Sequence, residues 1–240
     1  MQQNTFQNSP GVLNKNYAEV DTESITCSCD HLIFTTPSTF KMPLLAKNKG
    51  KFFCLSGEEF IHDAISKNQK SLHCVVEDHE NDSMIELAFR KVGFRMVPEG
   101  GRCSYGEKVR AIKWLRTLIE NFSENIITNS HGGDRRSENS HNDGDNLADM
   151  IGSRLQLDRD TINSYLNYSW YLNNETLNFL AVEKATKRFF EKAHVLKRQL
   201  MVKLQAQSTS EEEMTSQISA KMQQWHHIFI ETGRITDVEE

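Results

Sequence analysis

Residues 147–166 read LADMIGSRLQLDRDTINSYL, and this stretch decides how the second half of the chain is interpreted. Its first apolar residues have the spacing of one buried helix face: Met150, Ile151 and Leu155. Gly152 lacks a side chain and so allows a second helix to approach closely. Leu157 can point inward from a tight turn, after which Asp158 can accept the amide of Thr161 as the N-cap of a new helix. The pattern predicts a helix, a turn and a second helix.

In the second helix, one side is apolar and the other offers hydrogen-bonding groups. The inner side consists of Ile162, Tyr165 and Leu166. A helix that reads DNA in the major groove needs outward donors and acceptors, and Arg159 can reach guanine while Asn163 can pair with adenine. Ser164 and Asn167 can touch bases or phosphates, and Thr161 belongs to the same candidate surface. The alternative is a helical hairpin with an ordinary polar outer face.

The segment before this stretch is polar and basic. Residues 130–145 read SHGGDRRSENSHNDGD, contain no apolar residue and are predicted to form a loop. Arg135 and Arg136 follow two glycines there, which suits contacts to DNA phosphates. Arg154, and Lys113 on a preceding amphipathic helix, are the other candidate backbone contacts.

The first hundred residues carry a mixed pattern. Short apolar runs at 31–34, 52–55 and 72–76 predict buried strands, and helical spacing over 60–65 and 84–89 predicts helices between and after them. The sequence therefore predicts an α+β protein with a small α/β amino-terminal domain and an all-α second half. We expect a flexible arm over 1–24, the α/β domain over 25–103, a DNA-binding domain over 104–200 and a carboxy-terminal helix over 201–240.

Two long apolar stripes lie near the carboxy terminus. The first comprises Phe189, Phe190, Ala193, Leu196, Leu200 and Leu204, and the second Met214, Ile218, Met222, Trp225 and Phe229. The stripes fit an antiparallel helix pair packed on the preceding helices, or an interface between two chains. We expect a homodimer, because two reading helices one DNA turn apart recognise a palindrome.

Through these motifs the chain resembles the ParB family of partition proteins. GGDRRSENS at 132–140 and LADMIGSRLQLDRDTINSYLNYSWYLNNETLNFL at 147–180 are similar to that family's central DNA-binding domain. Four residues match the Leu-x-x-Glu-x-Leu helix that follows: Leu172, Glu175, Leu177 and Leu180. The resemblance covers about residues 25–197, and implies a sulfiredoxin-type amino-terminal domain. It also implies DNA binding in plasmid partition, chromosome segregation or transcription regulation, with a ParA-type ATPase as a partner.

One part of the family pattern is altered. CLSGEEFIHDAI at 54–65 stands where the family has a Gly-Glu-Arg-Arg box that holds CTP. Gly57 and Glu58 fit the box, but Glu59, Phe60 and His62 replace basic residues. The Glu-Asn motif of the next helix is replaced by Arg90-Lys91. Because a carboxylate repels a triphosphate, we expect no CTP binding, no cofactor and no enzymatic activity.

Composition indicates the class of protein. The chain has 240 residues, a net charge of −5 and five cysteines, an odd count that argues against a disulfide scaffold. Charged or amide residues interrupt every apolar stretch, and the first 16 residues lack the core of a secretory signal. We therefore expect a cytoplasmic protein associated with the nucleoid or a plasmid and not with a membrane.

The sequence also raises three other hypotheses: a metal site, an enzyme and a protein-interaction module. Cys27, Cys29 and His31 alternate as metal ligands on one strand face do, but half-buried strand cysteines account for them better. An enzyme of the sulfiredoxin-like or nuclease-like kind would use Cys54 or His62, and His79 beside Glu77 and Asp78 suggests an acid–base pair, although solvated surface charges explain it more simply. A helical protein-interaction module is the remaining alternative.

Overall fold

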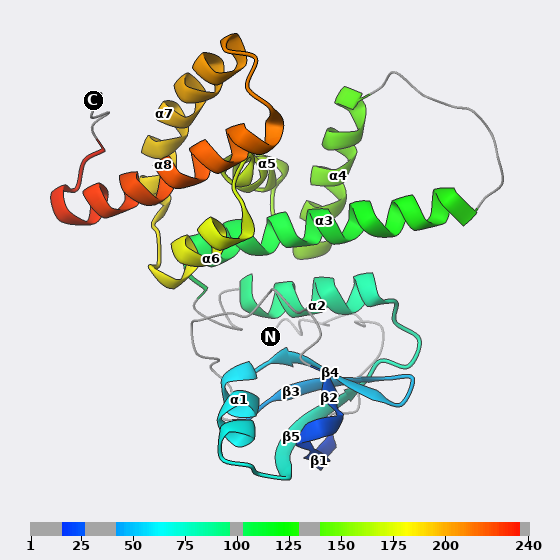
Figure 1. The fold of residues 1–240 in the computed structure, drawn as a ribbon. Helices are drawn as coiled ribbons and strands as arrows, with labels where there is room; N and C mark the ends of the chain where they lie inside the picture. Colours follow the sequence, from blue (N-terminus) through cyan, green and yellow to red (C-terminus); the bar gives the residue numbers. More distant parts are fainter. Residues whose placement is uncertain (1–15, 27–41, 97–102, 130–139, 236–240) are drawn as a thin grey trace, which may run out of the picture.

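The computed structural model describes residues 16–26, 42–96, 103–129 and 140–235, the side chains of 122–146 excepted. Its strands are β1 (Asn16–Asp21), β2 (Ile25–Thr26), β3 (Leu44–Asn48), β4 (Lys51–Ser56) and β5 (Ser71–Asp78). The first helices are α1 (Glu58–Ser66), α2 (Met84–Met96), α3 (Tyr105–Asn129) and α4 (Ser140–Leu155). They are followed by α5 (Arg159–Ser169), α6 (Asn174–Val182), α7 (Lys187–Ala206) and α8 (Glu211–Thr232). The predicted α+β class, with strands and helices alternating in the first part and helices alone after it, is confirmed (Figure 1).

The strands form one mixed sheet in the order β1-β5-β3-β4-β2. β3 and β4 are an antiparallel hairpin, whereas β3 runs parallel to β5 and β2 parallel to β4. Lys49 and Gly50 both have positive φ values, 48° and 74°, as a two-residue hairpin turn of matching twist requires. The strands predicted over 52–55 and 72–76 are confirmed as β4 and β5; the one predicted over 31–34 lies outside the described residues.

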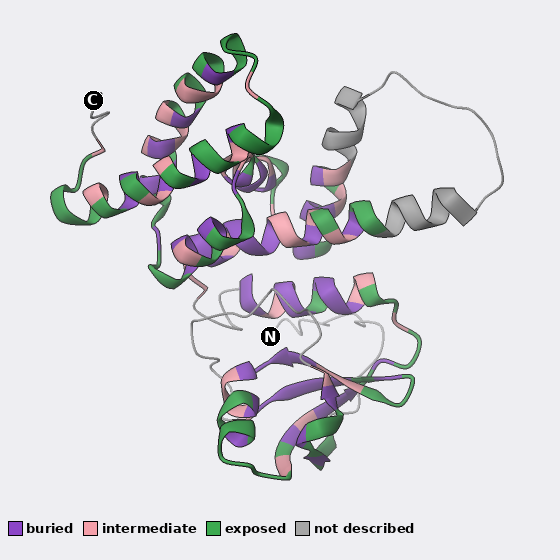
Figure 2. Ribbon diagram, in the orientation of Figure 1, coloured by how far each residue is buried: buried purple, intermediate pink, exposed green. Residues whose placement is uncertain are grey.

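Each face of the sheet is covered by one helix. α1 covers the face that carries Val20, Ile25, Leu45, Cys54 and Cys74, into which it inserts Ile61. The opposite face presents Leu44, Ala46 and Leu55 to Leu87 of α2. Because neighbouring strand residues point to opposite faces, the short apolar runs supply both layers. Most of β3 and the end of β4 are accordingly buried (Figure 2).

α2 lies between the sheet and the helical half (Figure 1). While Leu87 packs on the sheet, Phe89, Val92 and Met96 join the large helical core with residues of α3 to α8. The division at residues 103 and 104 that the sequence predicts falls between α2 and α3, and it stays a prediction.

The carboxy-terminal stripes are buried within the chain. Phe189, Phe190 and Ala193 of α7 and Met214, Ile218 and Trp225 of α8 belong to the helical core. Ser210 caps α8, accepting the amide of Glu213 at 3.2 Å, and three glutamates occupy the first turn, where the helix dipole favours them. These faces pack against the same chain, so dimerisation through them stays a prediction.

The structure corrects part of two predictions, the arm at the amino terminus and the polar loop before residue 146. Residues 16–24 were expected in a mobile arm, but Asn16–Asp21 is an edge strand paired with β5, followed by a 3-10 turn over Thr22–Ser24. The polar loop was expected to extend to residue 145, but α4 begins at Ser140. Both segments are polar, and a polar pattern does not exclude an edge strand or the exposed first turns of a helix.

Candidate nucleic-acid interface

The turn between α4 and α5 is as close-packed as the sequence predicts. The amide of Leu157 donates to the carbonyl of Gly152 at 2.9 Å, and Gln156 takes a left-handed φ of 56°. A Cβ atom at position 152 would lie only 2.7 Å from the carbonyl oxygen of Leu157. Glycine is therefore required where the chain folds back on α4.

Asp158 is the N-cap of α5, as predicted. Its carboxylate accepts the Thr161 amide and the Thr161 hydroxyl, each at 2.7 Å. These bonds favour the ionised carboxylate and lower the pKa of Asp158. Thr161, one of the candidate DNA contacts, is thus engaged in holding the start of α5.

α5 has the two sides that the sequence predicts. Ile162, Tyr165 and Leu166 are buried in the helical core. On the other side Arg159 and Asn167 are exposed, and Asn163, Ser164 and Thr161 are partly exposed. The structure therefore brings five of the nine candidate residues together on one helix: Arg159, Thr161, Asn163, Ser164 and Asn167.

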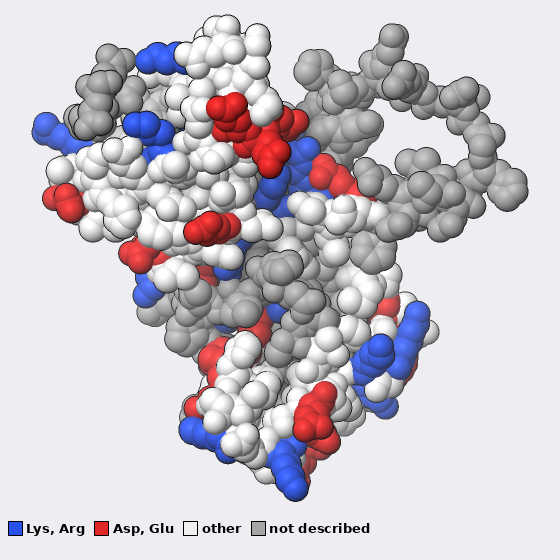
Figure 3. All heavy atoms as spheres, viewed as in Figure 1, with Lys and Arg blue, Asp and Glu red and all other residues white. Residues whose placement is uncertain are grey.

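The charge around α5 is balanced. Arg159 lies 3.6 Å from the carboxylate of Asp149 on α4, and both side chains are about half exposed. Arg154, at the end of α4, stacks its guanidinium 5.2 Å from the ring centre of Phe89. On the face of the whole molecule drawn in Figure 3, blue and red side chains are interspersed. Residues 147–169 themselves contain two arginines and three aspartates. This surface carries hydrogen-bonding groups and little net charge.

Lys113 is carried by α3 and not by α5. It lines a pocket of about 200 Å³ between α3 and α6, beside Arg110, which donates to Asn178 at 2.8 Å. Burial and the nearby Arg116 lower the pKa of Lys113. The remaining two candidates, Arg135 and Arg136, lie outside the described residues.

Sequence reasoning missed Lys197 of α7, whose side chain is buried. Its ammonium donates to the backbone carbonyls of Asn167, Tyr168 and Trp170 at 2.6, 3.1 and 3.0 Å. Burial and the nearby Lys113 lower the pKa of Lys197 to about 7. A signal was present, since Lys197 sits four residues after Ala193 inside the apolar stripe of α7.

At the altered box, the amino terminus of α1 presents acidic groups. Gly57 precedes the helix with a φ of +89°, and a Cβ atom there would lie 2.9 Å from the Cα of Pro43. Glu58 and Glu59 occupy the first turn, and the buried Glu58 carboxylate forms an ion pair with Lys91 of α2 at 2.8 Å. Carboxylates therefore occupy the end of the helix that attracts anions.

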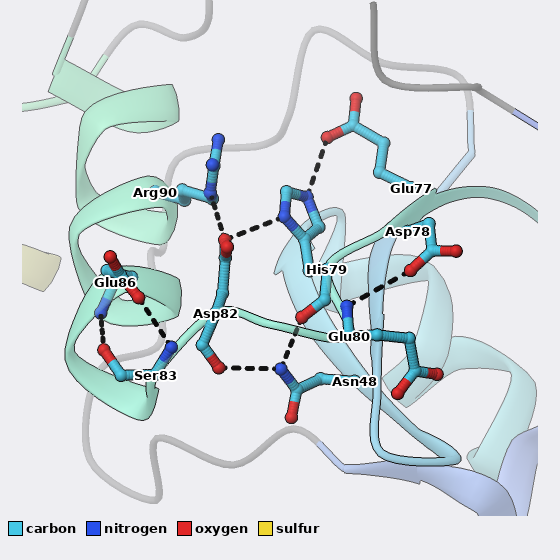
Figure 4. Close-up of polar contacts among 9 residues, drawn as sticks. All are labelled: Asn48, Glu77, Asp78, His79, Glu80, Asp82, Ser83, Glu86 and Arg90. Carbon is cyan, nitrogen blue, oxygen red and sulfur yellow. Dashed lines mark hydrogen bonds and ion pairs between the residues drawn. The ribbon is translucent and has the colours of Figure 1, made fainter. Parts of the chain in front are cut away.

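The other residues considered for chemistry have mostly structural environments. His79 was expected at the surface but is buried, with ring nitrogens 3.3 Å from Glu77 and 2.9 Å from Asp82 (Figure 4). Asp82 also binds Arg90, and the side-chain amide of Asn48 donates to the carbonyls of His79 and Asp82. The network ties the end of β5 to β3 and α2, which explains why these polar groups are buried.

Cys54 is buried in the sheet core, and His62 is exposed on α1. The two side chains that the enzyme alternative names, Cys54 and His62, thus have opposite environments. Among the described side chains, no three histidine, cysteine or acidic residues are grouped as metal ligands, and Cys27, Cys29 and His31 lie outside those residues. Within the described residues no helix is both long and apolar enough to cross a membrane.

Comparison with known proteins finds ParB structures. No family model and no curated sequence matches the chain. A truncated chromosome-partitioning protein ParB from Caulobacter crescentus, complexed to the centromeric parS site, is 13% identical, with 86% of this chain and 99% of that one covered and a TM-score of 0.33. A Pnob8-like ParB-N domain is 11% identical, with 80% and 90% covered and a TM-score of 0.41. The truncated Caulobacter crescentus protein complexed with CTP-γ-S is 13% identical, with 85% of this chain and 98% of that one covered and a TM-score of 0.26.

Proposed function

We propose that this chain is a sequence-specific double-stranded DNA-binding protein that uses α4 and α5 as a helix-turn-helix. The observation that carries the proposal is the division of α5 into a buried apolar side and an outward side of Arg159, Asn163, Ser164 and Asn167. The glycine-dependent turn and the Asp158 cap fix where that side begins. Arginine and asparagine match guanine and adenine edges in the major groove.

Contacts to the DNA backbone come from other positions in this proposal. Arg154, at the carboxy terminus of α4, neutralises a phosphate, and so do Arg135 and Arg136, which precede α4 in the sequence. Lys113 contributes from α3. Because residues 147–169 carry almost no net charge themselves, affinity depends on these cations while sequence discrimination depends on α5.

The biological role follows from the sequence resemblance. Partition of a plasmid or chromosome, or regulation of transcription at a nearby operator, needs a cytoplasmic protein that recognises one DNA site. A homodimer would place two α5 helices on a palindromic site, and a ParA-type ATPase would be the partner in partition.

Two arginine variants test the proposed division of labour. The probes are a duplex enriched from a random pool by the full chain and a random duplex, measured by fluorescence polarisation at several salt concentrations. Four phosphate contacts per chain give a slope of log K against log salt of about −3.6, and Arg135→Ala reduces its magnitude by about 0.9 on both duplexes. Arg159→Ala instead lowers the ratio of specific to random binding, because one base contact is worth about 1–3 kcal/mol.

Arg188→Ala serves as a matched control, because Arg188 is exposed on α7 and is not among the candidate contacts. It leaves both the slope and the specificity ratio unchanged. Equal losses on both duplexes for Arg135→Ala and Arg159→Ala would refute the division of labour. Retention that does not depend on salt would refute DNA binding and favour a protein-interaction module.

We also propose that the altered box does not hold CTP. The carboxylate of Glu59 in the first turn of α1 repels a triphosphate, and the ammonium of Lys91 is already paired with the buried Glu58. Isothermal calorimetry of the purified chain with CTP and magnesium is expected to show no saturable heat. Micromolar binding would overturn this proposal while leaving the DNA proposal standing.

A further inference from the structure

The pocket of about 200 Å³ between α3 and α6 is built on helices that the proposed base contacts do not use. At the start of α3 the two helices are in close backbone contact, since a Cβ atom at Gly106 would lie 2.4 Å from the carbonyl oxygen of Leu180. Farther along α3, the pocket lies between the residues from Arg110 to Asn121 and the first turns of α6. Its two walls are therefore helices that are fixed against each other.

The lining combines two cations with an aromatic ring. Arg110 and Lys113 carry the positive charges, and the apolar area includes Trp114 and Leu177. Arg110 is 6% exposed, and its guanidinium donates to the side-chain oxygen of Asn178 at 2.8 Å, which links the two helices. The NH₂ group of the same amide is then the end that can donate to a ligand. Among the described residues that line the pocket there is no aspartate or glutamate.

The two cations are partly desolvated, and an anion between them would stabilise their charged forms. Burial lowers the pKa of Arg110, and burial together with the nearby Arg116 lowers the pKa of Lys113. The carboxylates that act on this pair are not part of the pocket lining: Glu58, Glu107, Glu120 and Glu211. A negatively charged group inside the pocket would oppose the effect of burial on both cations.

We propose that this pocket binds a phosphate ester, with the phosphate held by Arg110 and Lys113 and the organic group against Trp114. Two cations suit a phosphate ester, which carries one negative charge as a diester and about 1.5–2 as a monoester near neutral pH. A guanidinium also matches the geometry of phosphate oxygens. Pockets for drug-sized ligands measure about 300–1,000 Å³, so this one suits a phosphate with a single ring. Only Lys113 is also a candidate DNA contact, and the inference does not require DNA binding.

Calorimetry of the full chain with phenyl phosphate tests the site without DNA. We expect saturable binding with a dissociation constant on the order of 0.1–1 mM, as for other ligands of this size. Inorganic phosphate binds more weakly because it lacks the ring, and benzoate because it has a single charge. Phenol binds about tenfold more weakly or less, because it makes no hydrogen bond between charged groups. The absence of saturation with phenyl phosphate, or an equal affinity for phenol or benzoate, would overturn the proposal.

Nuclear magnetic resonance locates the bound ligand. The indole N–H signal of Trp114, assigned through Trp114→Phe, is expected to shift as phenyl phosphate is added. The signal of Trp225, which is buried in the helical core, serves as the internal control and does not move. A ligand that leaves the Trp114 signal in place binds elsewhere, and the pocket proposal is then wrong.

Variants on α3 test the charge in the pocket. Lys113→Gln is expected to weaken phenyl phosphate about tenfold, because one charged donor is lost. Lys108→Gln is the matched control, since Lys108 lies on the same helix and does not line the pocket. Thr117 lines the pocket but is exposed, so substitutions there leave the core intact. Thr117→Glu places a like charge near the phosphate and binds about fivefold more weakly than the isosteric Thr117→Gln.

The Thr117 pair decides if Lys113→Gln does not fold. Equal affinities of Thr117→Glu and Thr117→Gln, or an unchanged affinity of folded Lys113→Gln, contradict the assignment of the phosphate to this pocket.

A random duplex without terminal phosphates identifies the source of the phosphate. It is added to the full chain saturated with phenyl phosphate. Release of the small ligand assigns the pocket to a phosphate of the DNA backbone, and binding of both together assigns it to a small phosphate ester; either result supports a phosphate site. A chain that binds phenyl phosphate but no duplex keeps the site while the proposed function fails. A chain that binds duplex but not phenyl phosphate refutes the site while DNA binding stands.

Discussion

Gly152→Ala tests the turn on which the proposed interface depends. The new Cβ atom would lie 2.7 Å from the carbonyl oxygen of Leu157, so the two groups must separate by about 0.7 Å to reach an ordinary contact of 3.4 Å. The same residue pair already shares a backbone hydrogen bond of 2.9 Å, which limits how far the turn can retreat. Overpacking of this kind costs about 1–3 kcal/mol, against a gain of at most about 1 kcal/mol from alanine's helix propensity.

We therefore expect Gly152→Ala to lower the free energy of unfolding by about 1–2 kcal/mol, measured by urea denaturation at 25 °C. Gly93→Ala is a matched control in α2, since its Cβ atom would meet Leu155 at 3.7 Å, an ordinary contact. That variant gains about 0.5–1 kcal/mol, because alanine loses less chain entropy in a helix.

The two variants also predict different effects on DNA. A displaced turn moves the start of α5 and with it Arg159, so Gly152→Ala is expected to lower specific binding even where it is fully folded. Gly93→Ala leaves binding unchanged. If both alanines stabilised the protein equally, α4 and α5 would not be in close backbone contact, and the geometry from which α5 was assigned would be wrong.

Three further predictions concern charged groups. Asp158→Ala lowers the thermal midpoint while Asp158→Asn largely retains it, and because the pKa of Asp158 is lowered in the fold, the cap's contribution is lost as pH falls below about 4. The pKa of Lys197 falls from 10.5 to about 7 in the fold, so the unfolded chain binds more protons between these values. Stability therefore rises across that range by up to about 1.4 kcal/mol per pH unit, and urea denaturation of Lys197→Met shows the loss of this slope. Glu58→Gln costs about 3–5 kcal/mol in urea denaturation because it leaves Lys91 buried without its carboxylate, and a double variant with Lys91→Met recovers part of it.

The helix, turn and helix were predictable because their signals are local. Asp158 and Thr161 are three residues apart, Gly152 precedes Leu157 by five, and the apolar periodicity of α5 is complete within eleven residues. Each signal acts through neighbours in the sequence, so a single sequence contains all of it. The assignment of Arg159 and Asn163 to DNA contacts uses side-chain chemistry in addition and stays a prediction.

What the sequence did not predict depends on distant partners. β1 is recognisable only through its pairing with β5, for example Tyr17 beside Val75, which are far apart in the chain. Charged side chains are expected at the surface unless a partner offsets their desolvation. Lys197 and Glu58 are buried because carbonyls or a lysine from other elements meet them, and no local pattern announces those partners. His79 differs, because its partners Glu77 and Asp82 lie within three residues of it in the sequence.

The balanced charge around α5 has a consequence for how recognition would work. A protein with a broad basic surface binds any duplex tightly, which reduces the ratio of specific to random binding. Here the carboxylate of Asp149 lies beside Arg159 and offsets its charge. Binding of Arg159 to DNA is therefore favourable only where a guanine edge replaces that carboxylate as its hydrogen-bond partner. Discrimination then depends on placing Arg159, Asn163 and Asn167 accurately rather than on attraction to phosphate. The Gly152 turn and the Asp158 cap fix the beginning of α5, and Lys197 holds its end, so accurate placement requires contacts at both ends of the helix.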